Sequence, residues 1–206
     1  MKAITLLSGG IDSPVAIHLM QRKGLEIVAV HFSYYPLTDK TTEEKCKTLA
    51  KKLGITKLYI IPFAQPQTEV VQHCDHALFY VITKRLMIKM ATEIAKKEGA
   101  QALITGENLG QVSSQTLHNL AVISAATDLP ILRPLLTKDK QEIVRLAETI
   151  GTYDISKGPE ICCLLGPKHP ATKSELKIVE EEEKKVSGEI ALTEPLRNKE
   201  LMNLSD

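Results

Sequence analysis

The sequence predicts an α/β fold, with a doubly wound, mainly parallel sheet and helices on both of its faces. Short apolar runs alternate with segments of helical pattern along most of the chain. The apolar runs are continuous, which is typical of strands that are buried on both faces. The expected strands are residues 3–7, 25–32, 57–63, 101–105 and 130–133.

The first strand and helix have the clearest boundaries. Residues 3–7 form a short apolar run that ends in a serine and two glycines. The next helix, over residues 14–23, begins with Pro14, whose missing N–H has no partner in a first helical turn anyway. Gly24 ends this helix, as glycine commonly does.

The later helices follow the same rule. Glycines 54, 99 and 151 each follow a segment of helical pattern. A loop that contains proline and glutamine precedes the longest of these segments. The expected helices are residues 42–53, 75–97, 111–127 and 138–150.

The pattern weakens toward the C-terminus. Residues 153–172 are rich in Pro, Gly and Cys and are expected to form an ordered loop. Residues 173–185 are expected to form a highly charged helix, and the polar residues 187–206 to be loosely held. We therefore expect one domain over residues 1–175, followed by a charged C-terminal helix and tail over residues 176–206.

Composition limits the possible functions. The chain has 206 residues, of which 43% are hydrophobic and 25% charged, enough for one sizeable core. Its net charge of +1 argues against a dedicated non-specific nucleic-acid binder, while nucleic acid remains possible as a substrate. The first residues run straight into a strand, unlike a signal peptide, and no apolar run approaches the roughly 20 residues of a membrane span. We expect a cytoplasmic protein that does not associate with membranes.

The four cysteines do not predict a structural disulfide or zinc site. Cys162 and Cys163 are adjacent, a spacing at which a bridge between them is strained. The sequence has no CxxC pair, and reduced thiols are expected in the cytoplasm. Cys46 is expected to be a small buried hydrophobic residue.

The strongest chemical signal is the run Ser-Gly-Gly-Ile-Asp-Ser at residues 8–13. It follows a buried strand and opens a helix, so its glycines and N–H groups can approach an anion closely. The Asp12 carboxylate can hold Mg²⁺ that bridges phosphate groups. No lysine follows the glycines, so the run is not a Walker A loop.

In a doubly wound sheet, ligands bind beyond the carboxyl ends of the strands. Five residues that stand at such ends are therefore expected to converge on one crevice. They are Ser8, His31, Phe63, Gly106 and Arg133.

Residues 8–13 resemble the PP-loop signature of the ATP pyrophosphatases, which cleave ATP to AMP and pyrophosphate. More specifically, the chain resembles the PP-loop domain of the tRNA 4-thiouridine synthases, sulfurtransferases that are also linked to thiamine thiazole synthesis. The resemblance runs from about residue 3 to about residue 175. The matching stretches are residues 6–16, 31–32, 105–117, 132–136, 139–140, 150–156, 162–163 and 170–173.

The resemblance implies an ATP site of adenine nucleotide alpha-hydrolase-like type. Lys84 and Arg85 fall where the family carries paired arginines near the phosphates, and the lysine departs from that pair. Without the resemblance, the two also fit a solvated helix face, and His31 a satisfied strand-end histidine. The residues expected to bind ATP are Leu6, Leu7, Ser8, Gly9, Gly10, Asp12, Ser13, His31, Phe32, Lys84, Arg85, Gly106 and Gln115.

Three residues take catalytic roles by resemblance. Asp12 is expected to hold Mg²⁺, Lys140 to assist adenylation, and Cys163 to relay sulfur as a persulfide or through a disulfide. Lys140 also fits an ordinary helix start, and Cys162 is either a resolving partner or a spectator. The implied reaction adenylates a carbonyl oxygen of uridine in tRNA and replaces it with sulfur, releasing AMP and pyrophosphate.

The family usually also has an N-terminal ferredoxin-like and THUMP region that grips tRNA, and often a C-terminal rhodanese domain. Neither region matches this sequence. Either a separate subunit binds tRNA, or the acceptor is a small molecule, as in thiazole-type sulfur transfer or amidation. A non-catalytic nucleotide-binding subunit is a third reading. A sulfur-donor protein or sulfide is the expected second partner, and a homodimer is a family-level expectation.

Overall fold

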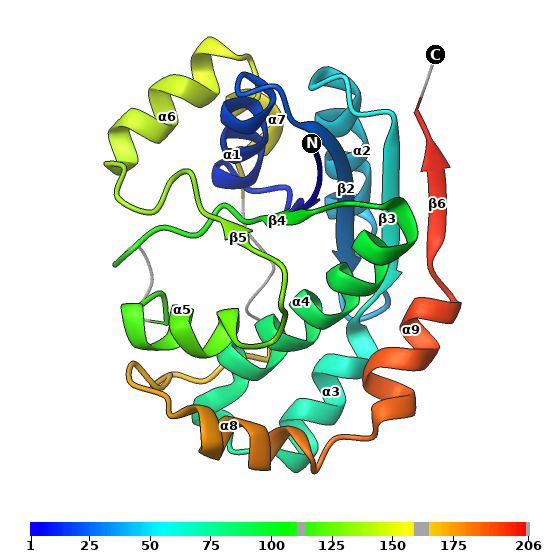
Figure 1. The fold of residues 1–206 in the computed structure, drawn as a ribbon, viewed down its shortest axis with the longest axis vertical. Coiled ribbons are helices and arrows are strands. Elements are labelled where there is room, and N and C mark those ends of the chain that lie inside the picture. Colours follow the sequence, from blue (N-terminus) through cyan, green and yellow to red (C-terminus); the bar gives the residue numbers. More distant parts are fainter. Residues whose placement is uncertain (111–113, 159–164, 205–206) are drawn as a thin grey trace.

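The computed structural model describes residues 1–110, 114–158 and 165–204. Within them, six strands form one sheet in the order β5-β4-β1-β2-β3-β6 (Figure 1). All neighbouring strands are parallel except β3 and β6, which are antiparallel. The strands are β1 (Lys2–Leu6), β2 (Glu26–Ser33), β3 (Lys57–Pro62), β4 (Ala102–Ile104), β5 (Ile131–Leu132) and β6 (Glu200–Asn203).

Helices cover both faces of the sheet, which confirms the doubly wound fold. Helices α3, α4, α5 and α8 contribute to one buried cluster, and α1, α2 and α6 to the other. The helices are α1 (Asp12–Gln21), α2 (Thr41–Lys52), α3 (Ala64–His73), η1 (His76–Leu78), α4 (Phe79–Glu98), α5 (Leu117–Ser124), α6 (Lys140–Thr149), α7 (Tyr153–Ser156), α8 (Leu176–Glu183), η2 (Glu189–Thr193) and α9 (Glu194–Arg197).

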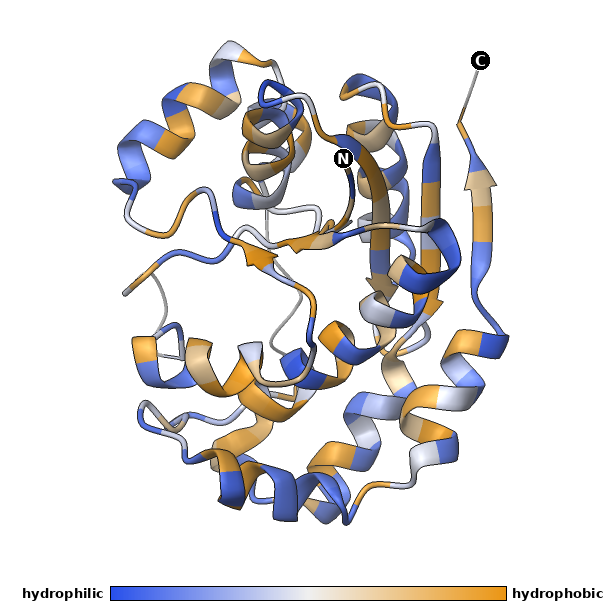
Figure 2. Cartoon of the chain, viewed as in Figure 1, coloured by the Kyte–Doolittle hydropathy of each residue, from blue (hydrophilic) through white to orange (hydrophobic). Residues whose placement is uncertain are grey.

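Alternation along the strands divides side chains between the two clusters. Ala3 and its neighbour Ile27 belong to the cluster under α1 and α2, whereas Ile4 and its neighbour Val28 belong to the cluster under α4. In Figure 2, β4 and β5 are coloured mainly as hydrophobic and β6 as mixed, whereas the outer face of α8 is coloured as hydrophilic. No helix among the described residues is both long enough and apolar enough to cross a membrane.

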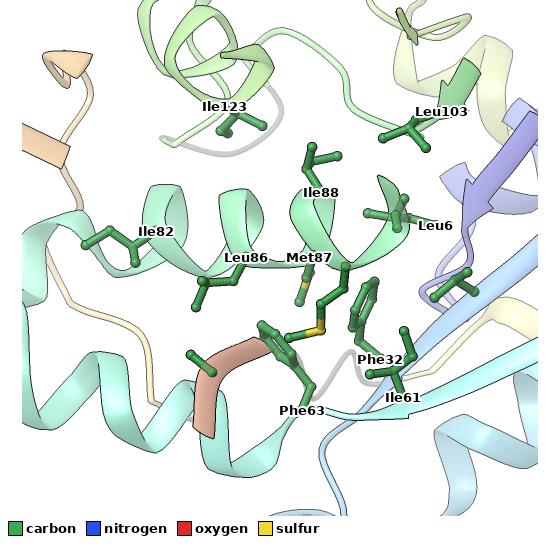
Figure 3. Packing of buried hydrophobic residues seen from close by; sticks show 14 of the residues in the cluster. Leu6, Phe32, Ile61, Phe63, Ile82, Leu86, Met87, Ile88, Leu103 and Ile123 are labelled. Atoms are coloured by element: carbon green, nitrogen blue, oxygen red, sulfur yellow. The ribbon is translucent and has the colours of Figure 1, made fainter. Parts of the chain in front are cut away.

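The longest helix, α4, lies over the sheet on the side of the cavity described below. Its Leu86 and Met87 point toward Phe32 and Phe63, which come from the ends of β2 and β3 (Figure 3). The Phe32 and Phe63 rings meet edge to face, with centroids 5.2 Å apart. Aromatic residues are few in this chain, and this group gathers several of them at the carboxyl end of the sheet.

The segment before α4 differs from the expectation. Residues 64–73 form helix α3 rather than a loop. Pro66 does not interrupt this helix, because it stands in the first turn, where proline is tolerated. The long helix begins at Phe79 instead of Asp75. Cys74 is extended, and the Asp75 carboxylate accepts a hydrogen bond from the Ala77 N–H, so a separate short turn precedes α4.

Two later expectations also change. The helix expected from residue 111 begins at Leu117 among the described residues, because Thr116 caps it through the Asn119 N–H. The C-terminal residues, expected to be loosely held, are in fact held against the sheet as far as Leu204. Strand β6 pairs with β3, and the Leu204 N–H donates to the Thr56 carbonyl at 2.7 Å.

Candidate active site

The loop over residues 8–13 joins β1 to α1, and the side chains of its two serines stabilise it by hydrogen bonds within the loop. The Ser8 N–H donates to Ser13 Oγ at 3.1 Å, and the Gly10 N–H donates to Ser8 Oγ at 3.2 Å. Helix α1 begins at Asp12, and the side chain of its N-cap residue, Ile11, does not cap it. The first-turn N–H groups therefore keep the arrangement that favours a bound anion.

Two glycines allow the loop its close packing. Gly9 has a φ of +82°, and a Cβ there would lie 3.3 Å from Cys46 Sγ. Gly106, two residues after the end of β4, is more tightly placed, because a Cβ would lie 2.9 Å from the Ser13 nitrogen. Only glycine lets the end of β4 approach the start of α1 so closely.

A cavity of about 250 Å³ lies beside this loop, beyond the carboxyl ends of β1, β2 and β4. Of the residues expected to bind ATP, all line it except Gly9, His31 and Arg85. The lining residues are Leu6, Leu7, Ser8, Gly10, Asp12, Ser13, Phe32, Tyr34, Gln67, Phe79, Tyr80, Val81, Thr83, Lys84, Met87, Thr105, Gly106, Glu107, Ser114, Gln115 and Ile123.

His31 lies beneath the loop instead of lining the cavity, because its side chain leaves β2 on the opposite face from Phe32. Its Nδ1 is 2.9 Å from the Leu7 carbonyl oxygen and 3.2 Å from Cys46 Sγ. Burial lowers the pKa of His31. A neutral imidazole that donates from Nδ1 to Leu7 fits this geometry, and it fixes the end of β1.

Arg85 is a structural residue in this arrangement rather than a lining one. Its side chain is 2% exposed, and Nε donates to Glu183 Oε1 at 2.8 Å. Its Nη1 donates to the Val122 carbonyl at 2.6 Å. The guanidinium group thus joins α4 to α5 and α8, while Lys84, one residue earlier on the helix, faces the cavity.

Glu107 is a lining residue that the sequence reasoning missed. It belongs to the long polar run after β4, and that run was the only signal for it. Its Oε2 accepts hydrogen bonds from Thr105 Oγ1 at 2.9 Å and from Arg133 Nε at 2.7 Å. Burial alone would raise the pKa of Glu107, but the charges of Lys84 and Arg133 outweigh burial and leave it lowered.

The segment after β4 is held by hydrogen bonds of amide side chains. Gln115 Oε1 accepts from the Asn108 N–H at 3.0 Å, and Asn108 Nδ2 donates to the Lys138 carbonyl at 2.7 Å. Asn119 is fully buried, and its side chain bonds to the backbone of Ser114, Ala171 and Ser174. This network fixes Ser114 and Gln115 at the cavity wall.

The expected convergence of strand ends is correct only in part. Ser8 and Gly106 line the cavity, whereas Phe63 packs behind Phe32, and Arg133 turns toward Glu107 and Ser124.

The catalytic residues expected from the resemblance lie in different places. Asp12 lines the cavity. Lys140 does not, because it lies exposed in the first turn of α6, which is capped by Asp139. Cys162 and Cys163 lie outside the described residues.

A glycine-rich loop after the first strand, facing a cavity at the strand ends of a doubly wound sheet, defines a PP-loop protein of the adenine nucleotide alpha-hydrolase-like class. Residues 1–187 match the family described as "Thiamine biosynthesis protein (ThiI)", and the chain belongs to that family.

Two curated relatives are each described as "Probable tRNA sulfurtransferase". The protein from Moorella thermoacetica is 44% identical over 98% of this chain and 54% of its own length. The protein from Thermus thermophilus is 42% identical over 98% of this chain and 51% of its own length. This chain therefore spans about half the length of the relatives that it matches.

Among solved structures, one described as "Crystal structure of a 4-thiouridine synthetase - RNA complex with bound ATP" superposes with a TM-score of 0.92. It is 38% identical, over 97% of this chain and 54% of the other. The NMN synthetase from Francisella tularensis, 18% identical with a TM-score of 0.58, covers 95% of this chain and 82% of its own and shares the fold alone.

Proposed function

We propose that this chain binds ATP in the cavity and adenylates a carbonyl oxygen of uridine in tRNA, so that sulfur replaces that oxygen to give 4-thiouridine. One observation carries the proposal. The cavity beside residues 8–13 belongs to a fold that superposes, with a TM-score of 0.92, on an ATP-bound 4-thiouridine synthetase in complex with RNA. Because the chain spans 54% of that protein, we propose the activity for this chain together with whatever part binds tRNA.

In the proposed reaction, the uridine oxygen attacks the α-phosphorus of ATP, and pyrophosphate leaves. The oxygen is then part of an AMP ester, which is a far better leaving group than oxide. Sulfur attacks the activated carbon, AMP departs with the original oxygen, and a thiocarbonyl remains. The N–H groups at the start of α1 and the charge of Lys84 stabilise the phosphates, so the acceleration comes from positioning and electrostatics.

The lining residues fit a magnesium ion that is held together with the substrate. Asp12 supplies a carboxylate, the hard oxygen donor that Mg²⁺ prefers. The described residues contain no group of three or more His, Cys, Asp or Glu side chains that could hold a metal. We therefore propose that Asp12 and phosphate oxygens share the ion, which would neutralise charge on the departing pyrophosphate.

Cys163 is our proposed sulfur carrier: its thiolate would take the outer sulfur of a persulfide on a donor protein, which leaves as a thiolate. Free sulfide would not load Cys163 but would attack the activated carbon directly. Lys140, which is exposed in the first turn of α6 and does not line the cavity, is our proposed aid to adenylation. These two assignments rest on the family resemblance alone.

The test is to mix the chain, together with the part that binds tRNA, with ATP, Mg²⁺, sulfide and unmodified tRNA, and to measure pyrophosphate and 4-thiouridine. Both products are expected, and both should fall sharply for Asp12→Asn. The matched control is Asp128→Asn, which removes an exposed carboxylate after α5. Pyrophosphate without thiolated tRNA would point to a small-molecule acceptor, and absence of both products and of ATP binding would contradict the proposal.

A further inference from the structure

A buried carboxylate stands in a cavity that we assign to an anionic substrate. The Glu107 side chain is 4% exposed, yet it lines the same cavity as the loop at residues 8–13. A negative charge in such a place opposes the binding of phosphates unless nearby cations outweigh it. Its presence therefore needs an explanation that packing alone does not provide.

The two oxygens of Glu107 have different surroundings. Oε2 is held from behind by the Thr105 hydroxyl at 2.9 Å and by Arg133 Nε at 2.7 Å. Arg133 is itself fixed, because its Nη2 donates to Ser124 Oγ at 3.0 Å. Oε1 lies 3.9 Å from Lys84 Nζ. The carboxylate is thus anchored on one side and presents its charge to a lysine on the other.

Lys84 is the movable member of this group. Its side chain is 33% exposed and lines the cavity from α4. At 3.9 Å the ammonium is attracted by the carboxylate but is too distant for a hydrogen bond, so its three donors can serve a third group. Without the intervening carboxylate, two cations would face each other, and the flexible lysine would move away from the fixed arginine.

We propose that Glu107 is a positioning residue, which holds the Lys84 ammonium in the cavity at the place where it meets the phosphates of ATP. The carboxylate touches neither the reacting atoms nor the phosphates, and it acts through the lysine. The group keeps a net charge of +1 from two cations and one anion, so the group itself still favours an anionic ligand. This inference rests on the proposed function.

A double-mutant cycle on ATP affinity tests the inference, with Kd measured by calorimetry in the presence of Mg²⁺. The four proteins are the wild type, Glu107→Gln, Lys84→Met and the double variant. Gln keeps the shape and an acceptor for Arg133 but loses the charge. We expect Glu107→Gln to weaken ATP binding about tenfold in the wild type. In the Lys84→Met background, the same change should leave the affinity within about twofold or tighten it.

An equal loss in both backgrounds would overturn the inference, because a merely structural glutamate does not need Lys84 to exert its effect. Glu142→Gln is the control, since it removes an exposed carboxylate that pairs with Lys138, and it should not change the affinity. Should Glu107→Gln fail to fold, the cycle is repeated with Glu107→Asp, which keeps the charge but draws it away from Lys84. A wild-type chain that does not bind ATP would instead contradict the proposed function itself.

Discussion

Two buried glutamates at opposite ends of β4 have the same kinds of partner, namely one hydroxyl group and two cations. Glu98, the last residue of α4, accepts from the Tyr59 hydroxyl at 2.6 Å and pairs with Lys57 at 2.8 Å and Lys2 at 3.7 Å. Glu107, beyond the carboxyl end of β4, likewise has one hydroxyl partner and two cationic partners. The Glu98 and Glu107 side chains are 6% and 4% exposed.

The difference lies in what surrounds each group. The partners of Glu98 come from β1 and β3 at the amino end of the sheet, and the group fastens the end of α4 to the strands. The Glu107 group has a cavity on its open side. Beside it, Gly106 leaves room for the loop at residues 8–13, and Lys84 lines the same cavity. We therefore expect a buried carboxylate with cationic partners to belong to a binding site only where the group faces a cavity.

The largest effect should come from substituting the two neighbouring cations of α4. Arg85 is buried in an ion pair with Glu183, whereas Lys84 faces the cavity. Arg85→Met leaves Glu183 buried without its main partner, so we expect the free energy of unfolding to fall by about 3–5 kcal/mol. Lys84→Met should change stability little but weaken ATP binding. Urea denaturation and calorimetry on both variants separate the two effects, and equal losses of stability would contradict the assignment.

A second pair of variants compares the two ends of β4 through their glycines. Gly106→Ala should weaken ATP binding by more than about tenfold, because the new Cβ meets the Ser13 nitrogen at 2.9 Å and displaces the loop. Gly99→Ala at the other end has open space but a φ of +65°, so it should cost about 1 kcal/mol of stability. Its ATP affinity should equal that of the wild type, as titration calorimetry can check.

Local patterns made the fold class predictable, and also the turn at residues 8–13 between β1 and α1. Continuous apolar runs and helix-ending glycines depend on neighbours in sequence, and so does the run at residues 8–13. The ion pair between Arg85 and Glu183 joins residues 98 positions apart, and no local pattern could predict it. The polar tail gave no sign of β6, because that strand forms only by pairing with β3.

The side of the sheet to which each side chain points could not be predicted from the matched stretches either. His31 and Phe32 are adjacent and belong to the same matched stretch, but alternation along β2 sends only Phe32 to the cavity. Glu107 was hidden for a different reason. Its cationic partners come from α4 and from the residue after β5, and neither can be recognised before the fold brings them together.

Acid should reduce the stability that the ion pairs and hydrogen bonds of Glu98 provide. Burial raises the pKa of Glu98, but hydrogen bonds from Lys57 and Tyr59 outweigh it and leave the pKa below its usual 4.5. A depressed pKa gives stability that is present above 4.5 and is lost as the pH falls through the folded-state value. Glu98→Gln should therefore cost about 1–2 kcal/mol at neutral pH, and less in acid, where wild type and variant become alike. Denaturation over a pH series measures this, and a constant difference would contradict it.

The smallest effect concerns the hydroxyl partner of Glu98. Burial, together with the hydrogen bond to Glu98, raises the pKa of Tyr59 to about 12. Because the folded-state pKa is raised, this contribution is present below the usual value of 10 and is lost as the pH rises toward 12. Tyr59→Phe should lower the free energy of unfolding by about 1 kcal/mol at neutral pH. Its ATP affinity should be unchanged, because the Glu98 group lies at the end of the sheet away from the cavity. A variant that lost ATP binding while keeping its stability would show that the two ends of β4 are coupled. The distinction between the Glu98 group, which faces no cavity, and the Glu107 group, which does, would then fail.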